Sequence, residues 1–233
     1  YALGWTHEEV LTAIVARYIS SYKDLPTALY QIQTKFRNEL RAKSGIMRGR
    51  EFLMKDMYSF SRSEEEHKEF YEKTAIAYMK IFERVGLGDK TYRTFASGGS
   101  FSKFSDEFQT LSNAGEDTIY VDEEKRIAVN KEVFTDEVLS EIGLDKSKLI
   151  EKKSIEVGNI FSLGTKFAEA EDLSYKNESG EKSLPIMGSY GIGLGRVMGT
   201  VVEILSDDKG IVWPEAIAPF SVHLVGLTDA SEL

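Results

Sequence analysis

Residues 30–39 predict a β-strand, because side chains of different polarity alternate there with a period of two. A second run over residues 51–56 follows a loop that contains Gly45 and Gly49, so the two runs predict an antiparallel hairpin with a long tip. One side of the first strand carries Tyr30, Ile32, Thr34 and Phe36, and the other carries Gln31, Gln33, Lys35, Arg37 and Glu39.

Helical spacing predicts three helices. Residues 7–22 form an amphipathic pattern that ends before Pro26. Ser63 followed by Glu66 is a capping-box pattern, and it begins a helix that extends to Gly86. A third helix is predicted over residues 193–205. The positions expected to be buried are Val10, Leu11, Ile14, Val15, Tyr18 and Ile19 in the first helix and Val197, Val201, Val202 and Leu205 in the third.

Short apolar runs predict further strands, together with a small helix at about residues 131–142. Antiparallel strands dominate, so we expect an α+β fold: a mainly antiparallel sheet flanked by helices. Two prolines at positions 214 and 219 then make a stiff connector to an apolar strand over residues 220–227. The other strands are expected at 92–96, 107–111, 118–121, 155–161 and 184–189.

The composition is that of a globular protein. A chain of 233 residues with 42% hydrophobic side chains can hold one large domain or one and a half. No run approaches the roughly 18 apolar residues of a membrane span, and no targeting pattern is present, so we expect a cytoplasmic location and no membrane partner. The lack of cysteine excludes disulfides and thiolate zinc sites, and the three histidines are scattered.

Charge clusters in the hairpin. The net charge of −9 argues weakly against a nucleic-acid partner, but a local basic tip on an acidic body remains compatible with binding one RNA end. The five clustered cations are Arg37, Arg41, Lys43, Arg48 and Arg50.

The hairpin is also the best candidate for a nucleotide site. Strand alternation places Arg37 and Glu39 on one side, so a guanidinium for phosphate and a carboxylate for an amino group face one ligand. Phe52 adds a flat apolar surface for a base. The alternative is a solvated hairpin whose charges pair across the strands at little net energy. The pattern alone leaves both interpretations open.

Four blocks of sequence, in order, resemble one family. Phe36-Arg-Asn-Glu39, together with residues 45–52 and 54–60, is similar to motif 2 of class II aminoacyl-tRNA synthetases, specifically the prolyl-tRNA synthetases of bacterial type. Residues 187–203, which begin Met-Gly-Ser-Tyr-Gly-Ile-Gly, resemble motif 3 of the same family. Residues 157–166 and 210–220 complete a resemblance that covers nearly the whole chain.

The resemblance implies a class II catalytic core at residues 1–213, with motif 2 at about 34–60 and motif 3 at about 187–205. No editing insertion is expected, since only about 33 residues separate Val121 from Ile155. Residues 214–233 would be a linker and the first strand of a truncated anticodon-binding domain. The chain is therefore expected to be a fragment that also lacks motif 1.

The implied reaction is the ATP-dependent activation of proline to prolyl-adenylate, followed by transfer of the prolyl group to the 3′ end of tRNA(Pro). ATP with Mg²⁺ would be required, zinc would not, and the full-length protein would be a homodimer. Two alternatives stay open: a synthetase-like protein that acts in binding or regulation, and an adenylating synthetase for another amino acid.

The resemblance also implies roles for individual residues. Arg37 would contact the α-phosphate and the amino-acid carboxylate, and Arg196 the base and the γ-phosphate, which makes these two the expected catalytic residues. Arg41 and Lys43 would contact the tRNA acceptor end. The expected ATP-binding set is Arg37, Glu39, Arg48, Phe52, Gln109 and Arg196, and the expected proline-binding set is Thr6, Glu8, Arg37, Glu107, Ser189 and Gly191.

Some of these positions also have a structural interpretation or depart from the family pattern. Thr6 taken alone is typical of a helix N-cap with Glu8 in the first turn, and the glycines that begin at Gly191 suit tight helix-on-sheet packing. Asp106, in the block 98–108, and Asn159 stand where the family typically has histidine. These two positions leave the details of the proline pocket open.

Overall fold

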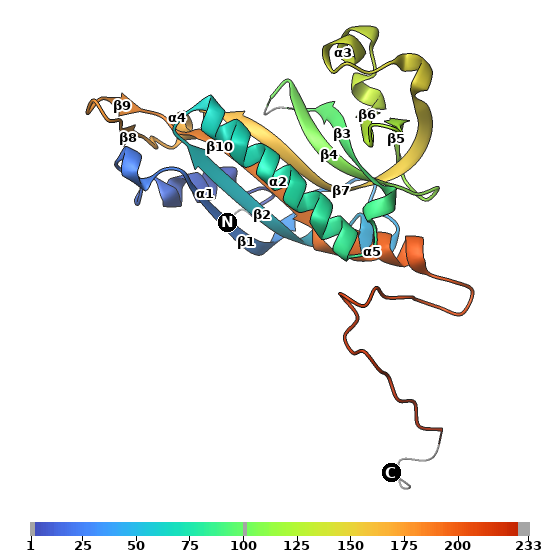
Figure 1. Ribbon diagram of the computed structural model, residues 1–233. Helices are drawn as coiled ribbons and strands as arrows, with labels where there is room; N and C mark the ends of the chain where they lie inside the picture. Colours follow the sequence, from blue (N-terminus) through green and yellow to red (C-terminus); the bar gives the residue numbers. More distant parts are fainter. Residues whose placement is uncertain (1–2, 100–101, 228–233) are drawn as a thin grey trace.

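A twisted eight-stranded sheet forms the centre of the computed structural model, which describes residues 3–99 and 102–227 (Figure 1). Neighbouring strands are antiparallel except for the pair β3–β6, which confirms the expected fold class. The strands, in spatial order, are β1 (Thr27–Phe36), β2 (Glu51–Ser61), β10 (Ile186–Gly193), β7 (Ile150–Gly164), β4 (Phe104–Leu111), β3 (Thr91–Ser97), β6 (Ile127–Asn130) and β5 (Asp117–Asp122).

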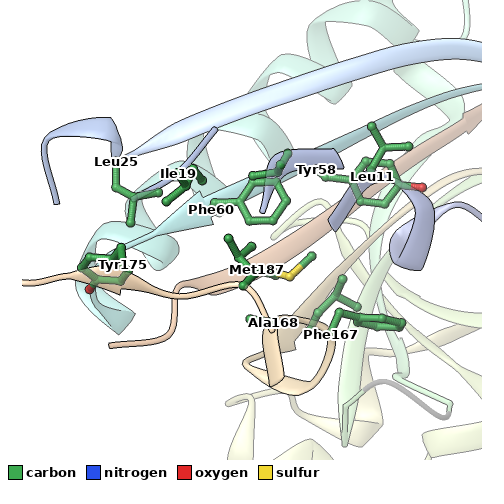
Figure 2. Packing of buried hydrophobic residues seen from close by; sticks show 12 residues of the cluster. Leu11, Ile19, Leu25, Tyr58, Phe60, Phe167, Ala168, Tyr175 and Met187 are labelled. Carbon is green, nitrogen blue, oxygen red and sulfur yellow. The ribbon is translucent and has the colours of Figure 1, made fainter. Parts of the chain in front are cut away.

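Helices cover both faces of this sheet. The long helix α2 (Glu64–Arg84) and α5 (Leu194–Leu205) contribute to one apolar cluster, in which Tyr78 and Phe82 meet Phe108 of β4. On the other face, α1 (Glu8–Val15) and α4 (Lys166–Ala170) share a second cluster with β2 and β10, as Figure 2 shows for Leu11, Tyr58 and Met187. The smaller elements are α3 (Asp136–Glu141) and the separate pair β8 (Tyr175–Lys176) and β9 (Lys182–Ser183).

The start of α2 follows from its sequence. The Ser63 hydroxyl accepts from the backbone N–H of Glu66, as the capping pattern predicts. The Glu66 carboxylate, however, accepts from the backbone N–H of Arg62 and not from that of Ser63, so the box is only half formed. Three glutamates in the first turn add a favourable interaction with the helix dipole. None of the helices in the described residues is long and apolar enough to cross a membrane.

Several predicted elements need correction. The first helix ends at Val15, and only part of its expected stripe is buried, because Leu11, Val15 and Ile19 face the sheet whereas Val10, Ile14 and Tyr18 are exposed. The predicted helix at 131–142 is a 3₁₀ turn followed by α3, and β6 was not predicted. In α5 only Val201 of the four expected positions is fully buried.

The apolar strand predicted at residues 220–227 is wrong. This segment is an extended coil that leads away from the sheet in Figure 1, and Leu224 and Leu227 are 90% and 95% exposed. A strand needs a hydrogen-bonding neighbour, and the described residues offer none at this place.

The hairpin of β1 and β2 buries the side opposite to the one its composition favours. Tyr30 and Ile32 of the edge strand β1 are 69% and 56% exposed. Lys35 lies on the other side of the strand and is almost completely buried, where it forms an ion pair of 2.8 Å with Asp56 of β2. The polar side of the hairpin therefore faces the interior, and a buried ion pair of this kind needs a set of hydrogen bonds around it.

Lys55 gives the fold a pH dependence. Burial lowers the pKa of this amine to about 8, although it donates to the Tyr78 hydroxyl at 2.7 Å and to the Tyr190 carbonyl at 3.0 Å. Because the pKa of 10.5 in the unfolded chain is higher, the unfolded state binds the extra proton, and the folded state gains stability as pH rises from 8 towards 10.5.

We therefore expect Lys55 to contribute a rise of about 2 kcal/mol to the unfolding free energy from urea titrations between pH 7.5 and 9.5. Glu107, whose carboxyl pKa is raised to about 8, should offset part of this rise, because its contribution to stability falls over the same range. Lys55→Met should remove most of this rise, whereas Lys80→Met, on the exposed side of helix α2, which carries Tyr78, should retain it. An identical pH profile for Lys55→Met and the unchanged protein would contradict this assignment.

Candidate active site

A cavity of about 340 Å³ opens on the face of the sheet that carries α1. Directly paired residues of three neighbouring strands line it: Asp56 of β2, Gly191 of β10 and Asn159 of β7. Gly191 leaves open the space above the strand, because a Cβ atom there would fill it and lie only 3.2 Å from Asn159 Oδ1. The volume of the cavity is that of an ordinary small-ligand site.

Most of the residues proposed from the sequence meet in this cavity. Glu107 and Gln109 of β4 do not line it: Glu107 pairs with Asn159 and lies one strand further along the sheet. Arg41 and Lys43 lie outside the cavity, in the tip of the hairpin. The predicted residues that line it are Thr6, Glu8, Arg37, Glu39, Arg48, Phe52, Ser189, Gly191 and Arg196.

Arg37 follows directly after β1, which ends at Phe36 and not at the predicted residue 39, so strand alternation does not place Arg37 and Glu39. Its Nε donates to the backbone carbonyl of Trp5 at 3.1 Å, and its guanidinium lies 5.2 Å from the centre of the Phe52 ring. Its other guanidinium N–H groups have no hydrogen-bond partner among the described residues and can bind an anion, and arginine keeps its charge at any ordinary pH.

Arg48 and Glu39 are paired with each other at the mouth of the cavity. Arg48 Nε lies 2.9 Å from a Glu39 carboxylate oxygen, and Arg48 Nη1 lies 2.5 Å from Glu116. Lys43 shares Glu116, at 2.5 Å. Charge pairing was the alternative interpretation of the hairpin, and it is present. Arg48 pairs with Glu39 within the hairpin tip, and Arg48 and Lys43 pair with Glu116 in the loop between β4 and β5. Glu116 had no signal in the sequence pattern, because it lies in an ordinary polar turn.

A buried carboxylate marks the opposite end of the cavity. Glu8 is 5% exposed, and it accepts from the hydroxyl of Ser189 at 3.1 Å and from the hydroxyl of Thr6. The N-cap interpretation of Thr6 is wrong, since His7 occupies that position and makes no capping hydrogen bond with its side chain. Thr6 and Glu8 therefore form an acceptor pair at the cavity wall.

Glu156 is a site residue that the sequence analysis missed. Its carboxylate accepts from Arg196 Nη1 at 3.0 Å and from Asn159 Nδ2 at 2.8 Å. Burial and the charge of Glu156 together raise the pKa of the Glu107 carboxyl to about 8. A glutamate inside the apolar strand predicted at 155–161 was the available signal, because a charge in such a run requires a partner.

Arg196 connects α5 to the tip of the hairpin. Its Nε donates to the carbonyl of Met47 at 3.1 Å, within the 3₁₀ turn Gly45–Met47 that lies on α5. The loop packs directly on this end of α5, since a Cβ atom at Gly195 would be in van der Waals contact, at 3.4 Å, with the Ile46 carbonyl. Arg196 thus lines the cavity and also holds the loop that carries Arg48.

The two departures from the family pattern differ in position. Asn159 lines the cavity. Asp106 does not, because strand alternation turns it to the opposite face, where it accepts from Tyr71 at 2.9 Å and from Arg93 at 2.8 Å. Ser100 and Phe101, from the same sequence block, lie outside the described residues.

Comparison with known proteins points to one family. The family described as "tRNA synthetase class II core domain (G, H, P, S and T)" matches residues 1–205. A proline–tRNA ligase of Anaplasma marginale is 40% identical over 243 residues, which are 98% of this chain and 57% of the relative. A proline–tRNA ligase of Neorickettsia sennetsu is 41% identical over 254 residues, with the same two coverages. The chain thus spans little more than half the length of these relatives.

Solved structures show the same fold at lower sequence identity. The prolyl-tRNA synthetase of Giardia lamblia in complex with prolyl-adenylate has a TM-score of 0.70 and 20% identity, and it covers 94% of this chain and 37% of the larger one. The enzyme of Cryptosporidium parvum complexed with L-proline and AMP has a TM-score of 0.67, also at 20% identity, covering 92% of this chain and 37% of that one.

Proposed function

This chain belongs to the family of class II tRNA synthetase core domains, and we propose that it activates proline with ATP and transfers the prolyl group to tRNA(Pro). The observation that carries the proposal is the division of one cavity into two ends. Glu8, Thr6 and Ser189 form an acceptor end for an ammonium group, and Arg48 and Arg196, which form ion pairs with glutamates in this structure, supply guanidinium groups for phosphates at the other. Arg37 lines the same cavity, and the charges of both Glu8 and Arg196 act on it.

The acceptor end suits the amino group of proline. A secondary ammonium carries two N–H donors, and the Glu8 carboxylate and Thr6 hydroxyl supply two acceptors. Glu8 is already desolvated, so a bound cation is held by a charge-assisted interaction that water screens poorly.

The chemical step needs positioning and charge neutralisation more than a titrating base. A carboxylate oxygen of proline attacks the α-phosphorus of ATP, the bond to the β-phosphate oxygen breaks, and pyrophosphate leaves. Arg37 would hold the proline carboxylate and the α-phosphate together, and it would stabilise the negative charge of the transition state. Arg48 and Arg196 would neutralise the outer phosphates, and Phe52 would stack on adenine beside Glu39.

Magnesium would enter with the nucleotide and supply a further positive charge at the phosphates. In residues 3–99 and 102–227, no group of three or more histidine, aspartate or glutamate side chains is arranged to hold a metal ion alone. Mg²⁺ bound to a nucleotide needs only one or two carboxylates. Glu156 at the cavity wall fits that requirement, with Glu107 one strand away, and the mutual repulsion of these two carboxylates would be relieved by a cation.

The proposed function is tested by ATP–pyrophosphate exchange on the intact protein with proline, alanine, threonine and serine. We expect exchange with proline. Exchange with a different amino acid would select a synthetase of other specificity, and the absence of exchange with all four would favour a binding or regulatory protein. Discrimination against alanine should be modest, since a pocket that fits proline cannot strongly reject a smaller side chain.

The hairpin tip is proposed to bind the tRNA acceptor end. Arg41 is exposed and Lys43 has a side chain that is 58% exposed, so both can reach phosphate oxygens outside the cavity. The double variant Arg41→Ala, Lys43→Ala should raise the KM for tRNA(Pro) in aminoacylation about tenfold, with a weaker salt dependence, because two phosphate contacts are lost. Proline-dependent exchange should stay unchanged.

The matched control is Lys80→Ala with Lys90→Ala, which removes two exposed cations distant from the tip and should leave the KM for tRNA as it was. A tRNA effect of equal size in both double variants would assign the loss to net charge alone and contradict the contact.

The remaining features of the family are proposals for the full-length protein: a homodimer in the cytoplasm that uses no zinc and carries no editing module. The exposed apolar side chains of the edge strand β1, Tyr30 and Ile32, are consistent with a surface that is covered in an assembly. Analytical ultracentrifugation of the full-length protein measures its oligomeric state.

A further inference from the structure

A buried polar cluster lies under the loop that carries Thr6 and Glu8. At its centre, the ion pair of Lys35 and Asp56 is 1% and 2% exposed. Gln31 Nε2 donates to Asp56 Oδ2 at 2.8 Å, and the Tyr58 hydroxyl donates to the same oxygen at 2.7 Å. None of these interactions is required by the proposed chemistry, and a buried ion pair seldom adds stability by itself.

The ring of His7 contacts this cluster, and its contacts require the neutral form of the ring. Two donors approach its Nδ1 atom: Lys35 Nζ at 3.0 Å and Gln31 Nε2 at 2.5 Å. Both are N–H donors, and the bond from Gln31 Nε2 to Asp56 fixes the orientation of the amide. Nδ1 must therefore accept, so the ring is neutral and carries its proton on Nε2.

The same cluster holds the main chain of the loop. The backbone N–H of His7 interacts with the Tyr58 hydroxyl, and the carbonyl of Gly4 accepts from the backbone N–H of Phe36 at 2.9 Å. The His7 ring packs so closely on Gly4 that a Cβ atom there would lie 2.4 Å from Nε2. The His7 ring thus packs between β1 and the loop. His7 is the direct sequence neighbour of Thr6 and Glu8, the two proposed acceptors for the substrate.

We propose that His7 is a positioning residue whose neutral ring sets Thr6 and Glu8 for the amino group of the substrate, and whose protonation releases them. The inference rests on the proposed function, since it concerns the affinity of the same site for proline. His7 touches no substrate atom in this scheme, and it acts through the loop.

The charges around the ring explain why acid should disrupt it. Lys35 of β1 would face a second cation, while Asp56 of β2 is already occupied by Lys35, Gln31 and Tyr58. Glu8 of α1 is the other nearby anion, and it is the group that the substrate needs. Burial and the charge of Lys35 lower the pKa of His7 below its usual 6.5, so the loop stays ordered at neutral pH.

The test is the pH profile of ATP–pyrophosphate exchange in the intact protein between pH 5.5 and 8.5. In the unchanged protein we expect the KM for proline to rise towards the acid end of this range, while the KM for ATP follows the titration of the nucleotide alone. His7→Asn keeps an acceptor near the Nδ1 position without a titrating proton, so it should retain the KM for proline at pH 7.5 within about threefold and lose the rise in acid. His7→Leu removes the acceptor and should raise the KM for proline about tenfold at every pH.

His67→Asn is the matched control, because His67 is also buried but lies on α2, where its Nε2 bonds to Ser162. It should keep the acid rise. If His7→Asn shows the same rise in the KM for proline as the unchanged protein, the inference is overturned, even if His7→Leu fails to fold. A protein without any proline-dependent exchange would instead overturn the proposed function, so the two failures are distinct.

Discussion

Replacing Arg37 by alanine should lower kcat/KM for proline-dependent ATP–pyrophosphate exchange by about 1,000-fold, since a preorganised donor to the transition-state charge is typically worth two to three orders of magnitude. Arg37 lines the same cavity as Glu8 and Arg196, and the charges of both act on it. Its loss should therefore reduce kcat as well as raise the KM values for both substrates.

Arg37→Lys should recover only a small part of the activity, because an ammonium group cannot bridge two anions with a planar fork. The control is Arg84→Ala, which removes an exposed arginine from the last turn of α2. A 1,000-fold loss that appeared only in the KM for ATP, with kcat and the KM for proline unchanged, would contradict the shared role of Arg37.

The second large effect is expected at Glu8, and it should be specific to proline. Glu8→Gln keeps the size of the side chain and an acceptor, but it leaves a buried substrate cation without its counter-charge. Loss of one partner of a buried charge pair costs about 2–5 kcal/mol, so the KM for proline should rise by a factor of about 100 or more. The KM for ATP should change little, because Arg48 and Arg196 are paired with Glu39, Glu116 and Glu156 and not with Glu8.

Glu9→Gln provides a matched control. Glu9 is the next residue of the same first turn of α1, but it is exposed. If Glu8→Gln and Glu9→Gln gave the same KM for proline, the acceptor end would have to be placed elsewhere, and Glu107 with Gln109, one strand beyond the cavity, would be the next candidates.

The sequence predicted local structure well where a signal repeats within one element. The alternation in residues 30–39, the glycines of the following loop and the capping pattern at Ser63 produced β1, β2 and α2, and their pairing was correct. The same local signal was misleading at residues 220–227, where apolar alternation met no neighbouring strand. A strand is defined by its partner, and a partner is not written in the segment itself.

The candidate site shows the same division. Residue types and their order along the chain indicated a phosphate-binding and adenine-binding hairpin, and most of these residues do line one cavity. They could not identify the partner of Glu156, whose bond to Arg196 joins residues 40 positions apart. Nor could they place Glu107 and Gln109 outside the cavity, because that depends on which strand lies between them and the ligand.

By itself the sequence determined the chemistry of this protein: clustered arginines, a Thr6–Glu8 pair, glycines that allow a close approach, and no cysteine. Only the tertiary structure decided which side of β1 is buried. There Tyr30 and Ile32 are exposed at the edge, and Lys35 and Gln31 point inward to Asp56 and His7. The period of a strand is set by its backbone, but the face that is buried is set by the elements that cover it, and these come from distant parts of the chain.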